Sequence, residues 1–199
     1  MPTNSAPPLF EALQGHFGAA KVTGRQDLNG RECVILSPAA WVEVISHLRL
    51  EHGFDVLMEL AGADYSGYPG HQGDPLCVTA MLYGSKSRER AWLKVFLPLE
   101  QPQVGTLSND YAGANWYERE CFDMYGVQFQ GHPYLKRLLL YDEFVGHPLR
   151  KDYPILKMQP LIPMRNAIDY EAVAAEKRRT TTPAQQDAAR RSDLAGGGN

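Results

Sequence analysis

The stretch SPAAWVEVISHLRLEHG, residues 37–53, decides the fold that this sequence predicts. Ser37 and Pro38 are typical of an N-cap and a first helical turn, and Gly53 is typical of a helix end. The apolar residues between them recur at the i, i+3, i+4 and i+7 spacing of one helix face, and they are Trp41, Val44, Ile45 and Leu48. Because a helix with one apolar stripe usually covers a sheet, we expect these four side chains to lie in a helix–sheet core.

The residues before this helix predict another helix and a hairpin. Leu9, Phe10, Leu13 and Phe17 have helical spacing directly after a pair of prolines. Residues 21–27 and 31–36 have strand character and flank the dipeptide Asn29-Gly30. Because Asn-Gly favours the two positive φ angles of a type I′ turn, we expect a β-hairpin there.

Three strands are expected after the central helix, at about residues 55–65, 75–83 and 90–97. The resulting order α-ββ-α-βββ predicts an α+β fold, a two-layer domain over residues 9–100 with helices packed on a mixed β-sheet.

The rest of the chain is expected to be less regular. Residues 1–8 are predicted to be a flexible N-terminus. Residues 101–156, here called the docking segment, are predicted to contain one short helix from about Leu107 into Asp123 and to be irregular beyond Gly126. Residues 157–199 are predicted to be an extended C-terminal arm, disordered after about residue 180.

Charge and composition exclude several function classes. The formal net charge of −3 gives no general attraction to nucleic acid, so none is expected as a partner. Cys33, Cys77 and Cys121 are far apart and form no CxxC pair, so the sequence predicts reduced thiols and no closed zinc or iron–sulfur site. Apolar runs are far shorter than the roughly 20 residues that span a bilayer, so no transmembrane segment is expected.

The docking segment is rich in aromatic and charged residues. Residues 116–154 hold nine of the twenty aromatic residues and eleven charged ones. Because Tyr, Trp and Arg are enriched in protein–protein contacts, we interpret this part as an interface. The candidate docking residues are Trp116, Glu118, Arg119, Glu120, Asp123, His132, Arg137, His147, Arg150, Lys151 and Asp152.

The histidines of this segment lie in two Gly-His-Pro copies. Proline forces its preceding residue into extended backbone, so His132 and His147 are expected to make hydrogen-bonded turns rather than to bind metal. His47 and His52 lie five residues apart, which is not the spacing of a helical metal pair, and are expected at the surface or at a helix cap.

The charged residues are expected to pair rather than to catalyse. Glu118 and Glu120 would point about 200° apart on a helix, so they cannot share a proton. Arg119 could reach Asp123 at the i+4 spacing. Planar Arg forks hold carboxylates well, so Arg137 and Arg150 could fix the segment to acidic groups on itself or on a neighbour. No catalytic, cofactor-binding or metal-binding residue is predicted.

Three runs carry a resemblance to a known family. They are ANWYERECFDMYG at 114–126, FQGHP at 129–133 and GHPLRKDYP at 146–154. Together they resemble the signature of the 30-kDa subunit family of respiratory complex I, the proton-pumping NADH–quinone oxidoreductase (NDH-1). The departures are small: Tyr134 stands where an acidic residue is common, and Lys136 where Arg is usual.

The resemblance implies a structural and assembly subunit that takes part in catalysis only within the complex. FMN and the iron–sulfur clusters would lie in partner subunits. The chain would pack on the 49-kDa subunit, which helps form the quinone pocket, and near the subunit that holds the terminal cluster, and would meet quinone only indirectly. Its expected place is the peripheral arm, on the cytoplasmic side of the cell inner membrane, as a peripheral membrane protein.

Two alternatives remain open. An equivalent piece of a membrane-bound hydrogenase or formate hydrogenlyase-type complex should continue into a nickel-binding region with CxxC pairs, and the sequence has none. A free-standing hydrolase using Glu120, Asp123 and His132 would be a monomer that loses activity in the variant Glu120→Gln. The length of the resemblance favours the complex I subunit over both.

Overall fold

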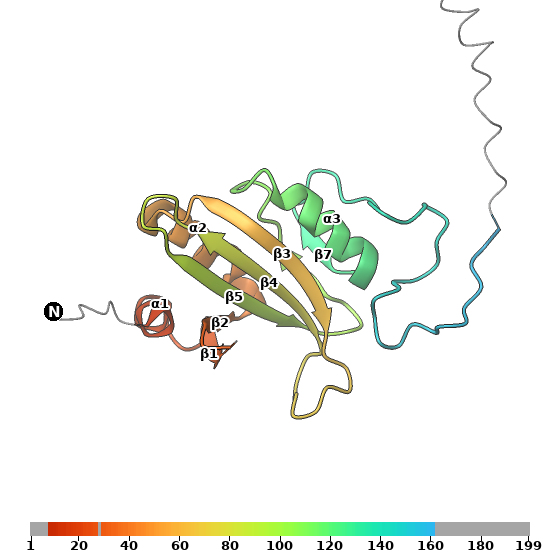
Figure 1. Cartoon of the computed structure of the whole chain (residues 1–199), viewed down its shortest axis with the longest axis horizontal. Coiled ribbons are helices and arrows are strands. Elements are labelled where there is room, and N and C mark those ends of the chain that lie inside the picture. The colour runs from red at the N-terminus through yellow and green to blue at the C-terminus, as the bar shows by residue number, and fades with distance from the viewer. Residues whose placement is uncertain (1–7, 28, 162–199) are drawn as a thin grey trace, which may run out of the picture. The chain divides into compact units, whose positions relative to one another are not determined.

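The computed structural model describes residues 8–27 and 29–161 (Figure 1). The predictions for residues 1–7 and 162–199, including the disordered tail, lie outside the described residues. The elements in chain order are α1 (Leu9–Phe17), β1 (Val22–Asp27), β2 (Glu32–Leu36), the 3₁₀ turn η1 (Pro38–Ala40), α2 (Trp41–His52), β3 (Val56–Asp64), β4 (Leu76–Tyr83), β5 (Arg90–Leu97), β6 (Gln103–Gly105), α3 (Ala114–Tyr125) and β7 (Gln128–Gln130).

The main sheet has five strands in the order β1-β2-β5-β4-β3. Strands β2 and β5 pair in parallel, and the other neighbours are antiparallel. The mixed sheet and the element order confirm the predicted α+β fold. At the hairpin, Asn29 and Gly30 have φ of 56° and 78°, the positive values that a type I′ turn requires.

Helix α2 packs on the sheet as its apolar stripe predicted. Trp41, Val44, Ile45 and Leu48 are buried, as are the side chains of β4 and β5 that share the core, Leu76, Val78, Ala80, Leu82, Ala91, Leu93, Val95 and Leu97. Gly53 ends the helix with a left-handed φ of 70°. The helix start differs from the prediction: Ser37 makes no side-chain capping bond. Instead, Ala40 N–H donates to the Ser37 carbonyl at 3.0 Å, closing the tight turn that leads into α2.

The docking segment is more regular than predicted at two places. Strands β6 and β7 pair in parallel from Gln103 with Gln128 to Gly105 with Gln130, so the expectation of irregular chain beyond Gly126 was wrong there. The sequence does not reveal this pair, because strands of three residues are too short to show an alternation of apolar and polar side chains. Their pairing also joins residues far apart in the sequence. The third helix begins at Ala114, not Leu107, because the backbone around Leu107 folds into turns that face the Glu118 carboxylate.

Helix α3 lies along β3, at the edge of the sheet farthest from β1 (Figure 1). The ring of Tyr125 crosses Gly62 so closely that a Cβ there would lie 2.5 Å from the ring. None of the helices within the described residues is long and apolar enough to cross a bilayer.

Candidate partner-docking site

The chain that follows α3 is organised around the buried carboxylate of Asp123. One oxygen, Oδ2, accepts the backbone N–H groups of three successive residues, Leu138, Leu139 and Leu140, at 3.0, 2.8 and 2.9 Å. The other, Oδ1, lies 2.6 Å from Nη1 of Arg137. Burial raises the pKa of this carboxyl, but the four hydrogen bonds outweigh burial and hold the pKa below its usual value. Asp123 is therefore ionised and fixes the loop that wraps its helix.

Arg137 extends this network to a second loop. Its Nη2 donates to the carbonyls of Phe144 and Gly146 at 2.9 and 3.1 Å. Its guanidinium also lies over the Phe144 ring, 5.7 Å from the centroid. Of the two options left open for Arg137, the structure shows pairing within the chain, and this pairing ties three parts of the docking segment together.

Glu118 forms a second buried centre at the start of α3. Its Oε2 accepts hydroxyl hydrogen bonds from Thr106 at 2.5 Å and Ser108 at 3.0 Å, and its Oε1 accepts the Leu107 N–H at 2.6 Å. Burial raises the pKa of Glu118, and these three hydrogen bonds oppose the rise. The residue thus anchors α3 to the chain that leaves β6.

The two Gly-His-Pro histidines make hydrogen bonds at turns. His132 accepts the Tyr134 N–H at Nδ1 at 2.9 Å, and its Nε2 lies 3.9 Å from Glu118. Nδ1 of His147 lies 3.0 Å from the Asp123 carbonyl. Burial lowers the pKa of His147, and the charges of Arg150 and Arg137 add to this effect, while the hydrogen bond to Asp123 opposes it. Among the described residues, no group of three or more His, Cys, Asp or Glu is arranged to hold a metal ion.

Arg119 does not pair with Asp123, contrary to the i+4 expectation. The Asp123 side chain turns toward the loop backbone, and Arg119 instead donates to the carbonyls of Lys136 and Arg137 at 3.0 and 2.9 Å. Its guanidinium contacts the rings of both Trp116 and Tyr134, 5.3 and 5.6 Å from their centroids. This arrangement holds two largely exposed aromatic rings in place on the surface.

The last part of the segment is tied back to α3 and to the sheet. Arg150 Nε donates to the Tyr125 carbonyl at 2.5 Å, and the Lys151 N–H donates to Oδ2 of Asp64, the last residue of β3, at 2.7 Å. Gly126, with a φ of 78°, lies under this crossing, where a Cβ would come within 2.6 Å of His147 and 2.7 Å of Arg150. Residues 126–154 are therefore fixed at several points.

The predicted docking residues separate into three groups. Glu118, Asp123 and His132 have no exposed side-chain surface and are bonded within the chain, so their side chains cannot contact a partner in this conformation. Four others are partly buried and bonded within the chain, namely Arg119, Arg137, His147 and Arg150. Glu118 and Glu120 lie on different sides of α3, as their spacing predicted. For the exposed residues the docking role stays a prediction, and they are Trp116, Glu120, Lys151 and Asp152.

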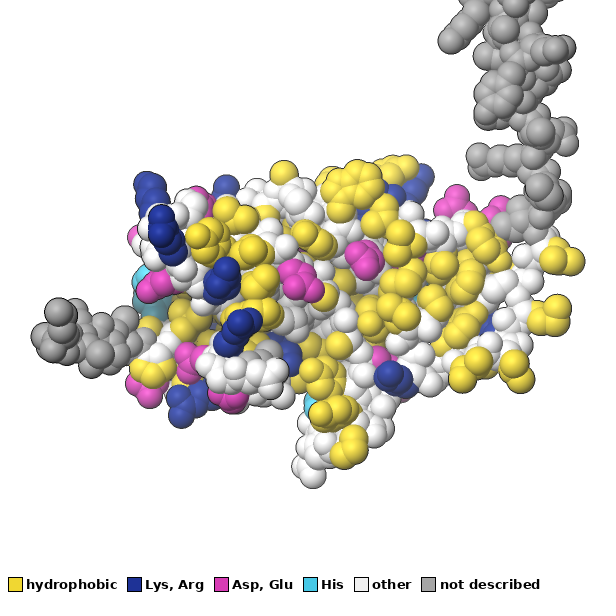
Figure 2. All heavy atoms as spheres, viewed as in Figure 1, with side chains coloured by type: hydrophobic (Ala, Val, Ile, Leu, Met, Phe, Trp, Pro, Cys, Tyr) yellow, Lys and Arg dark blue, Asp and Glu magenta, His cyan; other side chains and the backbone are white. Residues whose placement is uncertain are grey.

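Large apolar side chains are exposed around this framework. Ile155, Leu156 and Met158 are 98%, 92% and 91% exposed. Others on the segment are also exposed, namely Trp116, Tyr134, Leu139, Tyr141, Val145 and Leu149. Figure 2 shows hydrophobic side chains gathered over the part of the molecule that carries the chain after α3. Exposed apolar patches are typical of contact sites, so this surface is a candidate for docking.

The sequence reasoning missed Thr106, Ser108, Asp64 and Gly126 as parts of this site. The Glu118 partners lie 10 to 12 residues away in sequence, and Asp64 lies 87 residues from Lys151. The glycine at the end of α3 was the one local signal, since a helix end in the left-handed conformation favours glycine.

Comparisons with known proteins identify a matching family model and several relatives of this chain. A family model described as "Respiratory-chain NADH dehydrogenase, 30 Kd subunit" matches residues 34–159. The C subunit of the NADH-quinone oxidoreductase of Acidithiobacillus ferrooxidans is 35% identical over 182 residues, 89% of this chain and 88% of that protein. The protein of the same name from Leptothrix cholodnii is 40% identical over 134 residues, 65% of this chain and 67% of that protein.

Two solved structures share the fold. A trypsin-resistant fragment of Nqo5 is 29% identical, with a TM-score of 0.52 over 56% of this chain and 89% of that one. A chain from a membrane-bound sulfane sulfur reductase, an archaeal respiratory membrane complex, is 20% identical with a TM-score of 0.55 over 73% of this chain and 84% of that one.

Proposed function

Because the chain belongs to the family of the 30-kDa subunit of respiratory-chain NADH dehydrogenase, we propose that it is a cofactor-free structural subunit of a proton-translocating NADH–quinone oxidoreductase. Electrons would pass from NADH through FMN and iron–sulfur clusters of other subunits to quinone. This chain would hold its partners in fixed positions. The observation that carries the proposal is a surface of exposed apolar side chains mounted on an internally bonded framework.

The framework supports docking because it lowers the cost of binding. A loop that must become ordered when it binds loses conformational entropy, which weakens the complex. Here Asp123, Arg137 and Asp64 already fix the loops within the free chain. The exposed apolar side chains beside them can then be buried by a partner, and burial of apolar surface is the main favourable term in such contacts.

The bonding of the buried carboxylates supports a structural rather than a catalytic role. The oxygens of Asp123 accept four hydrogen bonds from the chain itself, and those of Glu118 accept three. Glu120 is exposed on another face of α3. The hydrolase alternative needs Glu120, Asp123 and His132 to converge on one substrate, and this arrangement gives it no support.

The partners that fit this proposal are the 49-kDa subunit and the terminal-cluster subunit, in the peripheral arm on the cytoplasmic side of the inner membrane. The chain would be a peripheral membrane protein that reaches the bilayer through other subunits. The exposed Ile155, Leu156 and Met158 are the first candidates for burial against a partner.

The test is the composition of the complex in cells that carry the double variant Ile155→Ser/Leu156→Ser. Because both side chains are almost fully exposed, the variant should leave the stability of the free chain unchanged and reduce the amount of assembled complex. Native gels with mass spectrometry measure assembly, and thermal unfolding of the purified chain measures stability. Leu50→Ser, at a side chain 72% exposed on α2, is the matched control and should assemble normally. A wild-type complex that lacks this chain would overturn the proposal.

A further inference from the structure

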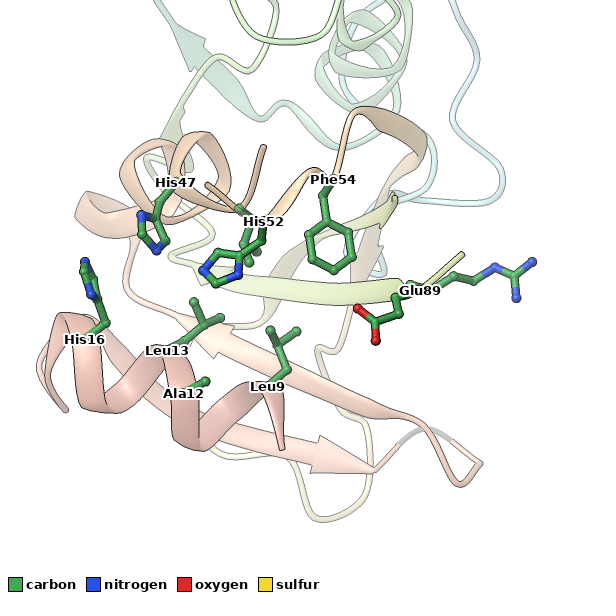
Figure 3. A pocket seen from close by; sticks show the side chains of 10 residues that line it. Leu9, Ala12, Leu13, His16, His47, His52, Phe54 and Glu89 are labelled. Atoms are coloured by element: carbon green, nitrogen blue, oxygen red, sulfur yellow. The ribbon is translucent and has the colours of Figure 1, made fainter. Parts of the chain in front are cut away.

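Two recesses meet beside α1, at the end of the molecule away from the chain that follows α3 (Figure 1). The smaller has a volume of about 310 Å³ and is lined by Leu9, Arg31, Glu32, Arg88, Arg90 and Trp92. The larger, of about 740 Å³, lies between α1 and α2 (Figure 3). Both are lined by Leu9 and Arg90, so they adjoin, and together they are here called the arginine groove.

The larger recess has an apolar floor and a wall of imidazoles. Leu9, Leu13 and Phe54 project into it from α1 and from the chain after α2 (Figure 3). The wall consists of His16, His47 and His52, whose neighbouring ring centroids are 4.5 and 5.1 Å apart. Burial lowers the pKa of His47, as do the charges of His16 and His52, while Glu51 opposes them. Near neutral pH His47 is therefore uncharged, and the permanent positive charges of the groove are those of its arginines.

The three arginines form no ion pair within the described part of the chain. Arg31 lies over the Trp92 ring, 5.9 Å from its centroid, and Arg90 lies 5.7 Å from that of Tyr83. Arg88 adopts a left-handed φ of 61° in the turn between β4 and β5. These cation–π contacts hold two of the guanidinium groups near the rings without using their hydrogen-bond donors.

Two carboxylates also belong to the groove. Glu32 is already engaged, since its Oε2 accepts the Phe10 N–H at 3.2 Å and its Oε1 lies 3.7 Å from Arg25. Glu89 lies on the rim, exposed, between Arg88 and Arg90 in sequence. Three guanidinium groups thus face one unengaged carboxylate, and the groove keeps a net positive charge.

The chemistry of the groove selects its occupant. Free guanidinium forks bind carboxylates in two-point contacts, and the adjoining apolar floor takes up hydrocarbon side chains. A membrane surface fits poorly, because interfacial binding needs apolar side chains that protrude into the bilayer, and here they line hollows. A peptide segment in which carboxylates alternate with apolar side chains matches both parts.

We propose that the arginine groove is a second docking surface, which binds an acidic amphipathic segment of another subunit of the same complex. The carboxylates of that segment contact Arg31, Arg88 and Arg90, and its apolar side chains enter the cleft between α1 and α2. This inference rests on the proposed assembly role. It makes the chain a bridge between two partners, one at each end of its sheet.

The experiment places the photoreactive residue p-benzoylphenylalanine at Ala12, an exposed position that lines the cleft, in cells that assemble the intact complex. A second strain carries the same residue at Leu156 as a reference for the docking segment. After irradiation, mass spectrometry identifies the cross-linked peptides. The expected product joins position 12 to an acidic amphipathic segment of another subunit. The triple variant Arg31→Gln/Arg88→Gln/Arg90→Gln should lower its yield about tenfold or more, because the charge pairs are lost.

Lys86→Gln is the matched control, since Lys86 lies on the same turn but lines neither recess. This change should alter the yield by less than about twofold, as expected for an exposed charge. Cross-links from position 12 to a segment without acidic residues, to this chain itself or to lipid overturn the proposal, as does their absence while Leu156 still cross-links. Failure at both positions, with the chain missing from the purified complex, instead overturns the proposed assembly role.

Discussion

The sheet beneath α2 and the docking segment obtain their order from different interactions. The first buries a periodic set of apolar side chains, among them Trp41, Ile45 and Leu93. The second winds around Asp123 and Glu118, whose oxygens collect hydrogen bonds from residues 10 to 17 positions away. Apolar burial is non-directional, whereas the hydrogen bonds to a carboxylate require each donor at a defined distance and angle. The chain beyond Phe129, where the buried apolar core of the described residues ends, thereby acquires a fixed surface from hydrogen bonds.

The largest effect on stability is expected for a substitution in the apolar core between α2 and the sheet. Trp41→Ala removes the largest fully buried side chain of α2 and should cost about 3–5 kcal/mol in the free energy of unfolding. Chemical denaturation followed by circular dichroism measures this cost. Since the docking segment is built on the sheet, both halves should unfold together. A variant in which the segment stays protected from protease while the sheet is lost would contradict this dependence.

The second largest effect is expected to be confined to the docking segment and to leave the sheet intact. Asp123→Ala leaves Arg137 without its carboxylate and three backbone N–H groups without an acceptor, which should destabilise the segment by about 3 kcal/mol. Hydrogen exchange should then rise in residues 126–154 and stay low in β4 and β5. The control is Glu120→Ala, on the exposed side of the same helix, which should change little. Equal loss of protection in sheet and segment would show that the two are not separable.

A pair of glycines gives a finer comparison. Gly126→Ala puts a methyl group at a positive φ and against His147 and Arg150, with an expected cost of about 1–3 kcal/mol. Gly113→Ala precedes the same helix at a φ of −65° with open space around it, and should be neutral or slightly stabilising. Thermal unfolding of the two variants distinguishes them. Similar melting temperatures would mean that the side chains of His147 and Arg150 can move to make room for a methyl group at Gly126.

The smallest effect concerns pH. The pKa of Asp123 is lower in the folded chain than its ordinary value of 3.8, so its contribution to stability is complete above that value and is lost as the pH falls through the folded pKa. Asp64, also with a lowered pKa, acts in the same direction, and Glu118, with a raised one, acts in the opposite direction. Proteolysis of residues 126–154 should therefore speed up in acid more in the wild type than in Asp123→Asn. If the wild type and Asp123→Asn responded equally to acid, titratable groups other than Asp123 would be responsible.

The sequence predicted the elements that show a periodic pattern of side chains or a short local motif. The stripe of α2 and the Asn29-Gly30 turn express a period and a dipeptide preference, and both elements formed where expected. The strand pair β6 and β7 and the partners of Glu118 depend on contacts between separate stretches of chain, which leave no periodic mark. For Arg119 the helical spacing to Asp123 was correct, but the carboxylate had better donors in the loop backbone.

The hydrogen bond from Lys151 to Asp64 has a consequence for the order in which the chain folds. It closes a loop of 87 residues, whereas the bonds to Asp123 close loops of 14 to 17. Short loops close at a smaller entropic cost and sooner. During synthesis the sheet can form before residue 151 has emerged from the ribosome, and we expect the wrap around Asp123 to form next. The contact with β3 then comes last of these, so residues 126–151 should already be in place when Ile155 and Leu156 meet a partner.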